Sequence, residues 1–282
     1  MASGMRVIKA DDLGEGGAFQ FSVTQADDVI AHASEHFLEA QAQAWRDIRT
    51  WADDQIALVQ TQDGGSPNGP GASLSLTGDL RAALPPLWAR HHIRSVLDVA
   101  CGDWNWMRFV DLSGLTDYVG WDIDGELISR CQQRAAAAMT EHPSRAARYP
   151  HTGFEVRNVA DSDFPTVDCI LARHILIHFP NDYITAILDR MRAGNATYLL
   201  ASNFPTATND FVYDPTRYSW MGYMEHPVNL EAPPFNLATK LDAIPETPGP
   251  AGVLTVPHEL ALFALDGAGE LCNAQDEGDY QP

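Results

Sequence analysis

The stretch Ser95-Val-Leu-Asp-Val-Ala-Cys-Gly-Asp-Trp-Asn-Trp106 predicts a buried strand that runs into a tight turn. A second strand is predicted in Tyr118-Val-Gly-Trp-Asp-Ile-Asp-Gly-Glu126, with Asp122 at its end. In a doubly wound sheet, ligands bind beyond the carboxyl ends of neighbouring strands, where a close backbone turn and an acidic side chain can grip sugar hydroxyls. The two segments together therefore predict a site for a nucleoside-like ligand.

The segment Leu97-Asp-Val-Ala-Cys-Gly102, taken with Asp122, resembles the first motif and the acidic loop of class I S-adenosylmethionine-dependent methyltransferases. The resemblance covers residues 69–266. One subset of these enzymes is more similar still, in Trp104-Asn-Trp-Met107 and in the upstream Gly69-Pro-Gly-Ala-Ser73. The common pattern has a third glycine where Trp104 stands, and a dinucleotide fingerprint needs more glycines, so a nicotinamide cofactor is disfavoured.

The resemblance implies the fold and the cofactor. We expect an α/β, Rossmann-like class I methyltransferase fold with a mostly parallel central sheet, and S-adenosyl-L-methionine as the methyl donor. Helix and strand signals alternate to about residue 203, and Pro257-His-Glu-Leu-Ala-Leu-Phe-Ala-Leu265 predicts the last strand. A helix is predicted from Ser75 that stops before Pro85-Pro86, and another over Asn181–Ala193.

The chain is predicted to have two parts. Residues 24–60 show an apolar stripe with helical spacing, and the Gly- and Pro-rich Thr61–Gly71 follows. We therefore expect an N-terminal helical extension over residues 1–68, acting as a lid or a homodimer element. The methyltransferase domain would occupy residues 69–282, with an irregular substrate-binding insertion at about 205–250.

The amino-acid composition limits which binding partners and which cellular compartment we expect. The 282 residues include 18 basic and 38 acidic side chains, a formal charge of −20, which repels phosphate backbones and anionic membranes. A solvated surface tuned for solubility explains the same charge. The four cysteines form no CxxC pair, no apolar run approaches about 18 residues, and the first residues lack the basic and apolar regions expected of a signal peptide. We expect a soluble cytoplasmic protein without a metal site, with a small-molecule acceptor as its partner and neither nucleic acid nor membrane.

The resemblance implies a donor site at the ends of the first strands. Its predicted members are Asp98, Ala100, Gly102, Asp103, Trp104, Asp122, Ile123, Asn158, Val159 and Arg173. Asp122 would bind ribose, and the turn at Ala100, Gly102 and Asp103 would cover the methionine part of the donor. Small residues also serve a plain strand-to-helix turn. Asn158 stands where the family usually has Asp for the adenine amino group, and Asn can still accept a hydrogen bond.

Aromatic and basic side chains extend the prediction. Trp104 and Trp121 are suited either to flanking a cation or purine or to core packing. Arg173 and His174 follow the predicted fourth strand, near the expected acceptor, and the resemblance would imply Asp at the position of His174. A neutral imidazole, with a pKa of about 6.5, can receive a proton from the acceptor. His178 comes four residues later, so in a helix both candidate bases would point to one side; structural histidines are the alternative.

Aromatics cluster in the insertion. Tyr218, Trp220, Tyr223, Glu225 and His226 are the predicted substrate-binding residues, or else they anchor a long loop.

We expect methyl transfer to a small natural-product acceptor. The N-terminal helix, the two histidines and the aromatic insertion together resemble bacterial enzymes that methylate the indole ring of tryptophan-containing cyclic dipeptides. Three alternatives stay open: O- or N-methylation of another small aromatic metabolite, methylation of a protein, and S-adenosylmethionine binding without catalysis.

Overall fold

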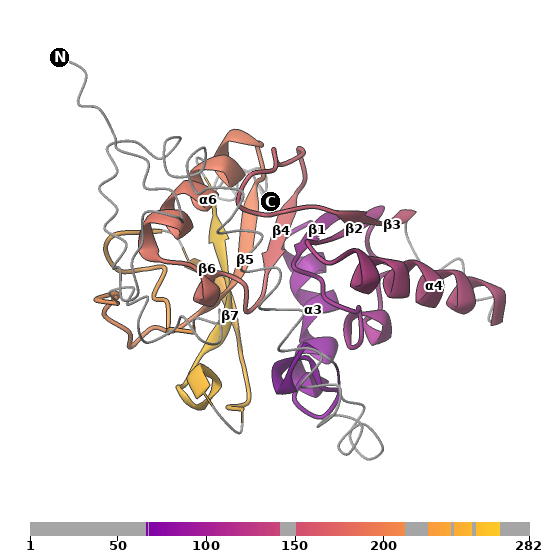
Figure 1. Ribbon diagram of the computed structural model, residues 1–282, viewed down its shortest axis with the longest axis horizontal. Coiled ribbons are helices and arrows are strands. Elements are labelled where there is room, and N and C mark those ends of the chain that lie inside the picture. The colour runs from indigo at the N-terminus through magenta and orange to yellow at the C-terminus, as the bar shows by residue number, and fades with distance from the viewer. Residues whose placement is uncertain are drawn as a thin grey trace, which may run out of the picture.

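The computed structural model describes residues 66, 68–141, 151–211, 225–237, 240–249 and 252–265. These residues contain a seven-stranded sheet with the strand order β3-β2-β1-β4-β5-β7-β6, which can be followed across Figure 1. The strands are β1 (Ser95–Val99), β2 (Asp117–Asp122), β3 (His151–Val156), β4 (Cys169–Ala172), β5 (Tyr198–Asn203), β6 (Lys240–Pro245) and β7 (Glu259–Ala264). The helices are α3 (Gly78–Arg90), α4 (Gly125–Glu141) and α6 (Asn181–Ala193).

The sheet is mostly parallel, as predicted. Strands β1 to β5 pair in parallel, while β7 runs antiparallel to both β5 and β6. The chain order reverses between β1 and β4, which are neighbours in the sheet, and crevices at such switch points bind ligands in open α/β folds. The predicted Rossmann-like α/β fold with a mostly parallel central sheet is therefore confirmed.

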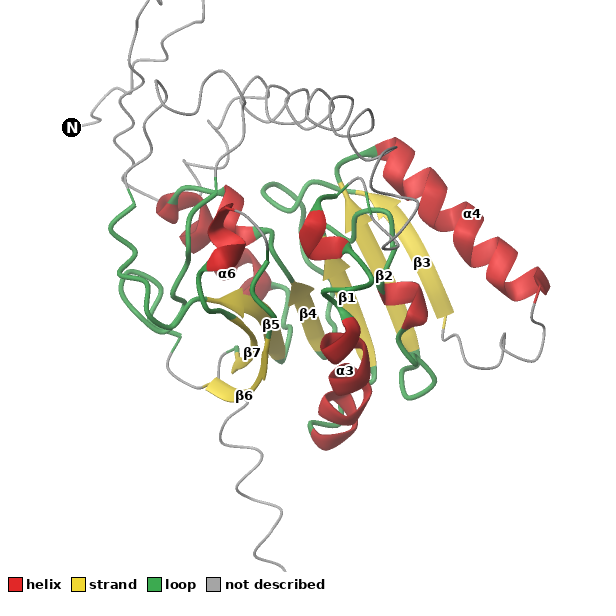
Figure 2. Cartoon of the chain, turned by 90° about the horizontal axis from the view of Figure 1, so that it is seen from below, coloured by secondary structure: helices red, strands yellow, loops and turns green. Residues whose placement is uncertain are grey.

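Apolar side chains fill both faces of the sheet. Along β1, Leu97 and Val99 belong to the core cluster that includes α6, whereas Val96 belongs to the cluster that includes α3 and α4. Alternation along a strand sends successive side chains to opposite faces, so α6 covers one face and the other two helices cover the second. Figure 2 shows α4 alongside β3 at one end and α6 at the other.

Two expectations about the elements were wrong. Helix α3 does not stop before Pro85 but continues through both prolines to Arg90, because its buried residues Leu84 and Leu87 lie on both sides of them. Burying these side chains offsets the cost of about 3 kcal/mol for proline inside a helix. The predicted irregular insertion contains β6, whose exposed and half-buried residues give no clear alternating pattern.

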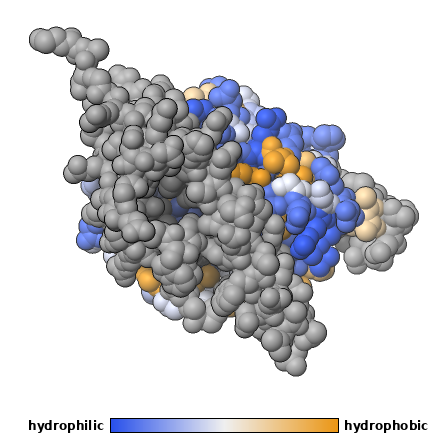
Figure 3. Space-filling model, viewed as in Figure 1, coloured by the Kyte–Doolittle hydropathy of each residue, from blue (hydrophilic) through white to orange (hydrophobic). Residues whose placement is uncertain are grey.

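Several predictions concern residues outside the described part. These are the helix over residues 24–60, most of the 1–68 extension, and Tyr218, Trp220 and Tyr223. No helix in the described ranges is both long enough and apolar enough to cross a membrane. The coloured surface in Figure 3 is mainly hydrophilic, and the large apolar side chains exposed among the described residues are Phe109, Ile123 and Val156.

Candidate functional site

The candidate residues gather at one edge of the sheet. Parallel strands β1, β2 and β4 end there, and so do β5 and β6, which have the same direction. Since β7 is antiparallel, it begins where the others end, and Asn203 at the end of β5 is paired with Glu259 at the start of β7. Residues that follow β4 and β6, or precede β7, are thereby brought to the edge that holds the predicted donor site.

The turn after β1 is fixed to Asp122. The amide of Gly102 donates to Oδ2 of Asp122 at 3.0 Å, and the amide of Asp124 donates to Oδ1 at 2.9 Å. Three residues of the turn, Ala100, Gly102 and Trp104, have positive φ angles of 58°, 59° and 55°. The predicted turn is therefore in direct contact with Asp122, the residue predicted to bind ribose. Two backbone amides set the orientation of the Asp122 carboxylate.

Replacing Gly102 with alanine is expected to destabilise the fold. A Cβ at this position would lie 2.4 Å from Nδ2 of Asn68, and a left-handed conformation costs a non-glycine residue about 1–2 kcal/mol. The free energy of unfolding, measured by urea titration, should fall by at least that amount. Gly114→Ala is the matched control, since nothing lies within 4 Å of a Cβ added there, and it should change stability little. Equal stabilities of the two variants would contradict the tight approach.

Asp103 holds neighbouring segments together. Its Oδ1 accepts hydrogen bonds from Ser66 Oγ at 2.8 Å and Asn68 Nδ2 at 3.0 Å, and its Oδ2 accepts from Arg134 Nη1 at 2.9 Å. The side chain is buried, and Arg134 belongs to α4. Both carboxylate oxygens are thus used to tie the turn to α4 and to the segment before α3, which favours a structural role over the predicted donor contact.

Trp104 lies in the core and not at a ligand surface. Its ring is buried and packs edge-on against Phe154, with centroids 5.2 Å apart, and tilted against Tyr118 at 6.3 Å. Trp121 is also buried and packs against Phe164. Core packing, one of the two alternatives from the sequence, therefore describes both tryptophan rings, and the contribution of Trp104 to the turn comes from its backbone.

Asp98 is a buried acid behind the turn. Its Oδ2 accepts a hydrogen bond from the Tyr118 hydroxyl at 2.5 Å. Burial raises the pKa of Asp98 to about 7, with the Tyr118 hydrogen bond opposing, the Asp122 charge adding to the rise and the Arg173 charge lowering it. The Asp98 carboxyl group therefore titrates near neutral pH. It lies on β1, between the strand that ends in Asp122 and the strand that precedes Arg173.

The loop after β3 borders Asp122. The Arg157 amide donates to the Asp122 carbonyl at 2.9 Å, which places Asn158 next to the end of β2. The Asn158 side chain accepts from the Ala160 amide and donates to Asp161, while Val159 is buried. Ile123, by contrast, is 39% exposed. The predicted adenine-side residues are close in space, with Ile123 offering the accessible apolar surface.

Arg173 is engaged in a buried ion pair. Its Nη2 and Nε lie 2.6 and 2.9 Å from Oε2 of Glu246, and its Nη1 donates to the Gly71 carbonyl at 2.9 Å. The guanidinium also lies over the Trp106 ring, 5.3 Å from its centroid. Arg173 was predicted to contact the donor; its contacts instead join the end of β4 to the end of β6 and to the segment before α3.

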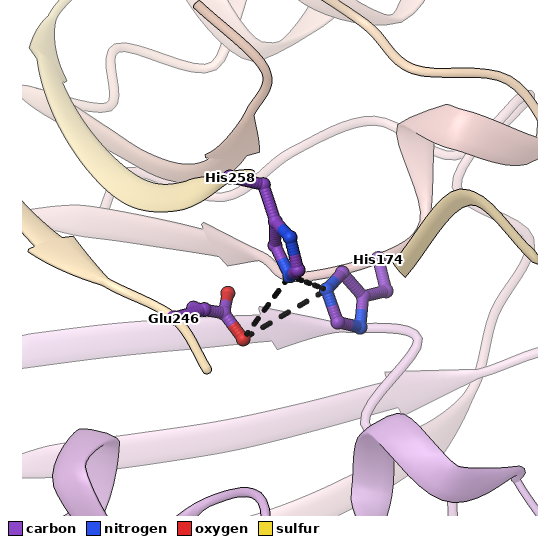
Figure 4. A group of neighbouring side chains, drawn as sticks. All are labelled: His174, Glu246 and His258. Carbon is purple, nitrogen blue, oxygen red and sulfur yellow. Dashed lines mark hydrogen bonds and ion pairs between the residues drawn. The ribbon is translucent and has the colours of Figure 1, made fainter. Parts of the chain in front are cut away.

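His174, His258 and Glu246 form a compact cluster, drawn in Figure 4. The two Nε2 atoms are 3.4 Å apart, and Oε2 of Glu246 lies 3.8 Å from that of His174 and 3.9 Å from that of His258. A metal ion could bridge atoms so close together. However, Oε2 already accepts two hydrogen bonds from Arg173, whose positive charge balances the carboxylate.

The backbone around His174 is specialised. Its φ angle is 54°, and its amide donates to the Ser202 hydroxyl at 2.9 Å. Burial lowers the pKa of His174 well below its ordinary value, with the charges of Arg173, His258 and His178 acting in the same direction. The imidazole is therefore neutral near physiological pH, the form that can receive a proton.

His178 does not extend a helix from His174. A 3-10 turn, Leu176–His178, follows the left-handed His174, so the expected helical spacing of the two histidines was wrong. His178 is buried at the end of this turn. The geometry therefore favours His174 over His178 as the candidate base.

The described residues of the insertion are anchors. Nε2 of His226 lies 2.7 Å from the Phe179 carbonyl, and its ring stacks on Phe211 with centroids 4.1 Å apart. Burial lowers the pKa of His226, so this ring is neutral and donates to the carbonyl. Glu225 accepts from the Val253 amide at 3.3 Å. Both were predicted to orient a substrate; their contacts favour the alternative, that they hold the insertion against the domain.

Known proteins resemble the chain in structure only. No protein-family model matches it, and neither does any curated protein. Magnesium protoporphyrin IX methyltransferase (ChlM) from Synechocystis PCC 6803 with bound SAH has a TM-score of 0.47 at 14% identity, covering 67% of this chain and 84% of that chain. N-methyltransferase NodS from Bradyrhizobium japonicum with SAH has a TM-score of 0.47 at 14% identity, covering 68% of this chain and 88% of that chain. The methyltransferase SibL in its apo form has a TM-score of 0.44 at 15% identity, covering 66% of this chain and 54% of that chain. All three are methyltransferases.

Two residues of the cluster, Glu246 and His258, were not predicted from the sequence. Glu246 directly follows β6, and His258 directly precedes β7; the Glu246 amide donates to the His258 carbonyl at 3.1 Å. The polar residues that flank an antiparallel strand pair lie at the same edge. Recognising β6 and β7 as such a pair would have brought both residues to the carboxyl end of β4, beside His174.

Proposed function

We propose that this protein is an S-adenosylmethionine-dependent methyltransferase that acts on a small acceptor beside His174. The observation that carries the proposal is the contact between the Gly102 amide and the Asp122 carboxylate at the ends of β1 and β2. A turn with a positive φ allows close approach of a ligand, and a carboxylate at the end of the second strand suits the two hydroxyls of ribose.

The surroundings of Asp122 fit the remainder of the donor. Ile123 offers exposed apolar surface beside it for a purine, and Asn158 is close enough in the chain fold to approach the same base. Asp98 supplies a buried acid near the turn, where a cationic ligand would be attracted. The bound donor would supply an electrophilic methyl group on its sulfonium sulfur.

Donor affinity is expected to rise with pH. Because the pKa of Asp98 is raised to about 7, the carboxyl is neutral below that pH and negatively charged above it. A sulfonium and ammonium ligand favours the ionised form, so affinity should increase by up to about tenfold between pH 6 and pH 8. Isothermal titration calorimetry across this range measures it. Asp98→Asn should flatten the profile; an equally steep profile in that variant would assign the dependence to another group.

For the acceptor, we propose the indole ring of a tryptophan-containing cyclic dipeptide, methylated at the carbon that bears the side chain. Methylation there is followed by ring closure to a pyrroloindoline, which releases one proton. The neutral, half-buried His174 at the end of β4 is suited to take it. Holding donor and acceptor in line supplies much of the remaining acceleration.

A product assay tests this acceptor. The full chain is incubated with S-adenosylmethionine and cyclo-(Trp-Trp), and products are followed by mass and ultraviolet spectra. We expect a mass gain of one methyl group with loss of one indole chromophore. A methylated product with its indole chromophores intact would overturn C-methylation in favour of N-methylation, and methylation of added proteins alone would indicate a protein substrate. Donor binding without transfer to any acceptor would indicate a binding protein.

A further inference from the structure

We infer that His174, His258 and Glu246 form a proton-accepting relay in which Nδ1 of His174 is the atom that takes the proton of the acceptor. The inference rests on the proposed methyltransferase function for its chemistry, but its structural part, the position of the ring hydrogens, can be measured without any substrate. His258 and Glu246 act as positioning residues, and neither was identified from the sequence.

The first step concerns His258. Its Nδ1 lies 2.8 Å from the Val256 carbonyl oxygen. A carbonyl oxygen can only accept, so Nδ1 of His258 carries the hydrogen. In a neutral imidazole the other ring nitrogen is then an acceptor. The side chain of His258 is 1% exposed, and its ring stacks on Phe204 at 5.0 Å, so this orientation is held by packing as well.

The second step passes from His258 to His174. The two Nε2 atoms are 3.4 Å apart, and that of His258 is an acceptor, so the hydrogen between them belongs to His174. This distance is long for a hydrogen bond, and catalytic hydrogen bonds often shorten only when substrate is bound. A neutral His174 with its hydrogen on Nε2 has its lone pair on Nδ1.

The third step concerns the surroundings of Nδ1. This atom makes no hydrogen bond to the described part of the chain. It is nevertheless not fully buried, because the fully buried polar atoms without a partner do not include it. It faces Gly71, where an added Cβ would approach it to 2.9 Å. The side chain of His174 is 14% exposed, against 1% for His258. The lone pair is therefore on the accessible side of the cluster, next to the Gly69–Ser73 segment.

The fourth step concerns charge. Before proton transfer, Glu246 and Arg173 neutralise one another through Oε2 of the carboxylate, and the lowered pKa of His174 keeps its ring neutral. After transfer, the His174 imidazolium has the Glu246 carboxylate 3.8 Å away and donates to His258, while the charges of Arg173, His258 and His178 oppose the new charge. Oε1 of Glu246 is fully buried without a hydrogen-bond partner among the described residues, so this second oxygen is a further acceptor in the cluster.

The reaction balances with this relay. The indole double bond supplies the electron pair that bonds the acceptor carbon to the methyl group, and the sulfur keeps the electron pair of the broken carbon–sulfur bond. A nitrogen of the cyclic dipeptide then bonds to the neighbouring ring carbon of the resulting iminium, its N–H bond breaks, and that proton passes to Nδ1 of His174. No oxidant, reductant or further reactant is needed.

The direct test is the tautomer of each ring. Long-range 1H–15N spectra of the full chain labelled with 15N-histidine, without substrate, should show His174 with its hydrogen on Nε2 and His258 with its hydrogen on Nδ1. His174→Gln and His258→Gln assign the signals, and His151→Gln, at an exposed histidine, is the matched control. His174 with its hydrogen on Nδ1 would overturn the relay. So would a shift of both Nε2 signals on adding one equivalent of Zn²⁺, which would identify the cluster as a metal site.

The kinetic test uses Glu246→Gln with S-adenosylmethionine and cyclo-(Trp-Trp). Loss of the carboxylate should lower kcat at least tenfold and move the acid limb of the kcat profile to lower pH, because the imidazolium is less stabilised; calorimetric donor affinity should stay within twofold. Unchanged kcat and an unchanged acid limb would overturn the role of Glu246. If the wild-type chain fails to bind the donor, the proposed function fails, while the tautomer result still decides the arrangement of the relay.

Discussion

Asp122→Ala is expected to weaken S-adenosylmethionine binding by about 10- to 100-fold, since hydrogen bonds to a charged group contribute about 1.5–3 kcal/mol. Two backbone amides orient the carboxylate, from Gly102 in the turn and from Asp124 in its own loop. The variant therefore loses both the acceptor for ribose and the group that fixes the turn. Calorimetry with the wild type and the variant measures the effect.

The control must separate binding from folding. Asp117→Ala removes the same charge from the other end of β2, where the side chain is exposed, and should leave donor affinity within about twofold. Asp122→Asn keeps an oxygen for one amide and should give an intermediate affinity. If Asp122→Ala is folded by circular dichroism and binds the donor as tightly as Asp117→Ala, the donor site lies elsewhere.

His174→Ala is expected to reduce kcat by about 10²- to 10⁴-fold, the usual contribution of a positioned general base. The reason is the loss of the neutral imidazole at the end of β4, which is held by Ser202 through its amide and by His258 through its ring. Donor affinity should change little, because the turn at Gly102 and its contact with Asp122 are separate from this cluster. Initial rates at saturating donor and acceptor measure the effect.

Added imidazole provides a chemical control. Restoration of part of the rate in His174→Ala, but not in Asp122→Ala, would identify the lost group as a base. His151→Ala should have wild-type rates, since His151 is exposed at the start of β3. A His174→Ala variant whose kcat stays within threefold of the wild type would show that positioning alone accounts for the reaction and that His174 is structural.

The contact between the turn after β1 and Asp122 was largely predictable because these residues are local in sequence. The strand, the turn and the acidic residue of the next strand occupy Ser95–Asp122, so hydrophobic runs and small residues suffice to bring Gly102 to Asp122. Helix α6 was also predicted with its observed bounds, Asn181–Ala193, because its buried residues recur with helical spacing. Local patterns decide these elements.

The cluster of His174, Glu246 and His258 was not predictable in the same way. His174 meets Glu246 and His258 only because β6 and β7 pair at the far side of β5, and β6 has no regular alternation of buried and exposed residues. Asp103 has partners that the motif did not indicate: its position favoured a ligand contact, while Ser66, Asn68 and Arg134, distant in the chain, donate hydrogen bonds to both of its oxygens. Long-range partners decide such side chains.

The connection between β6 and β7 begins at Glu246 and ends at His258, both at the edge of the sheet where β4 ends. A backbone hydrogen bond joins these two residues. The two ends of the connection are therefore joined directly to each other. Surface loops tolerate changes of length and sequence when their ends are fixed. The exposed residues Thr247, Pro248, Thr255 and Pro257 are consequently natural positions for a mutant library that tests new acceptors. Val253 and Leu254 belong to the core and the Val256 carbonyl orients His258, so these residues are left unchanged.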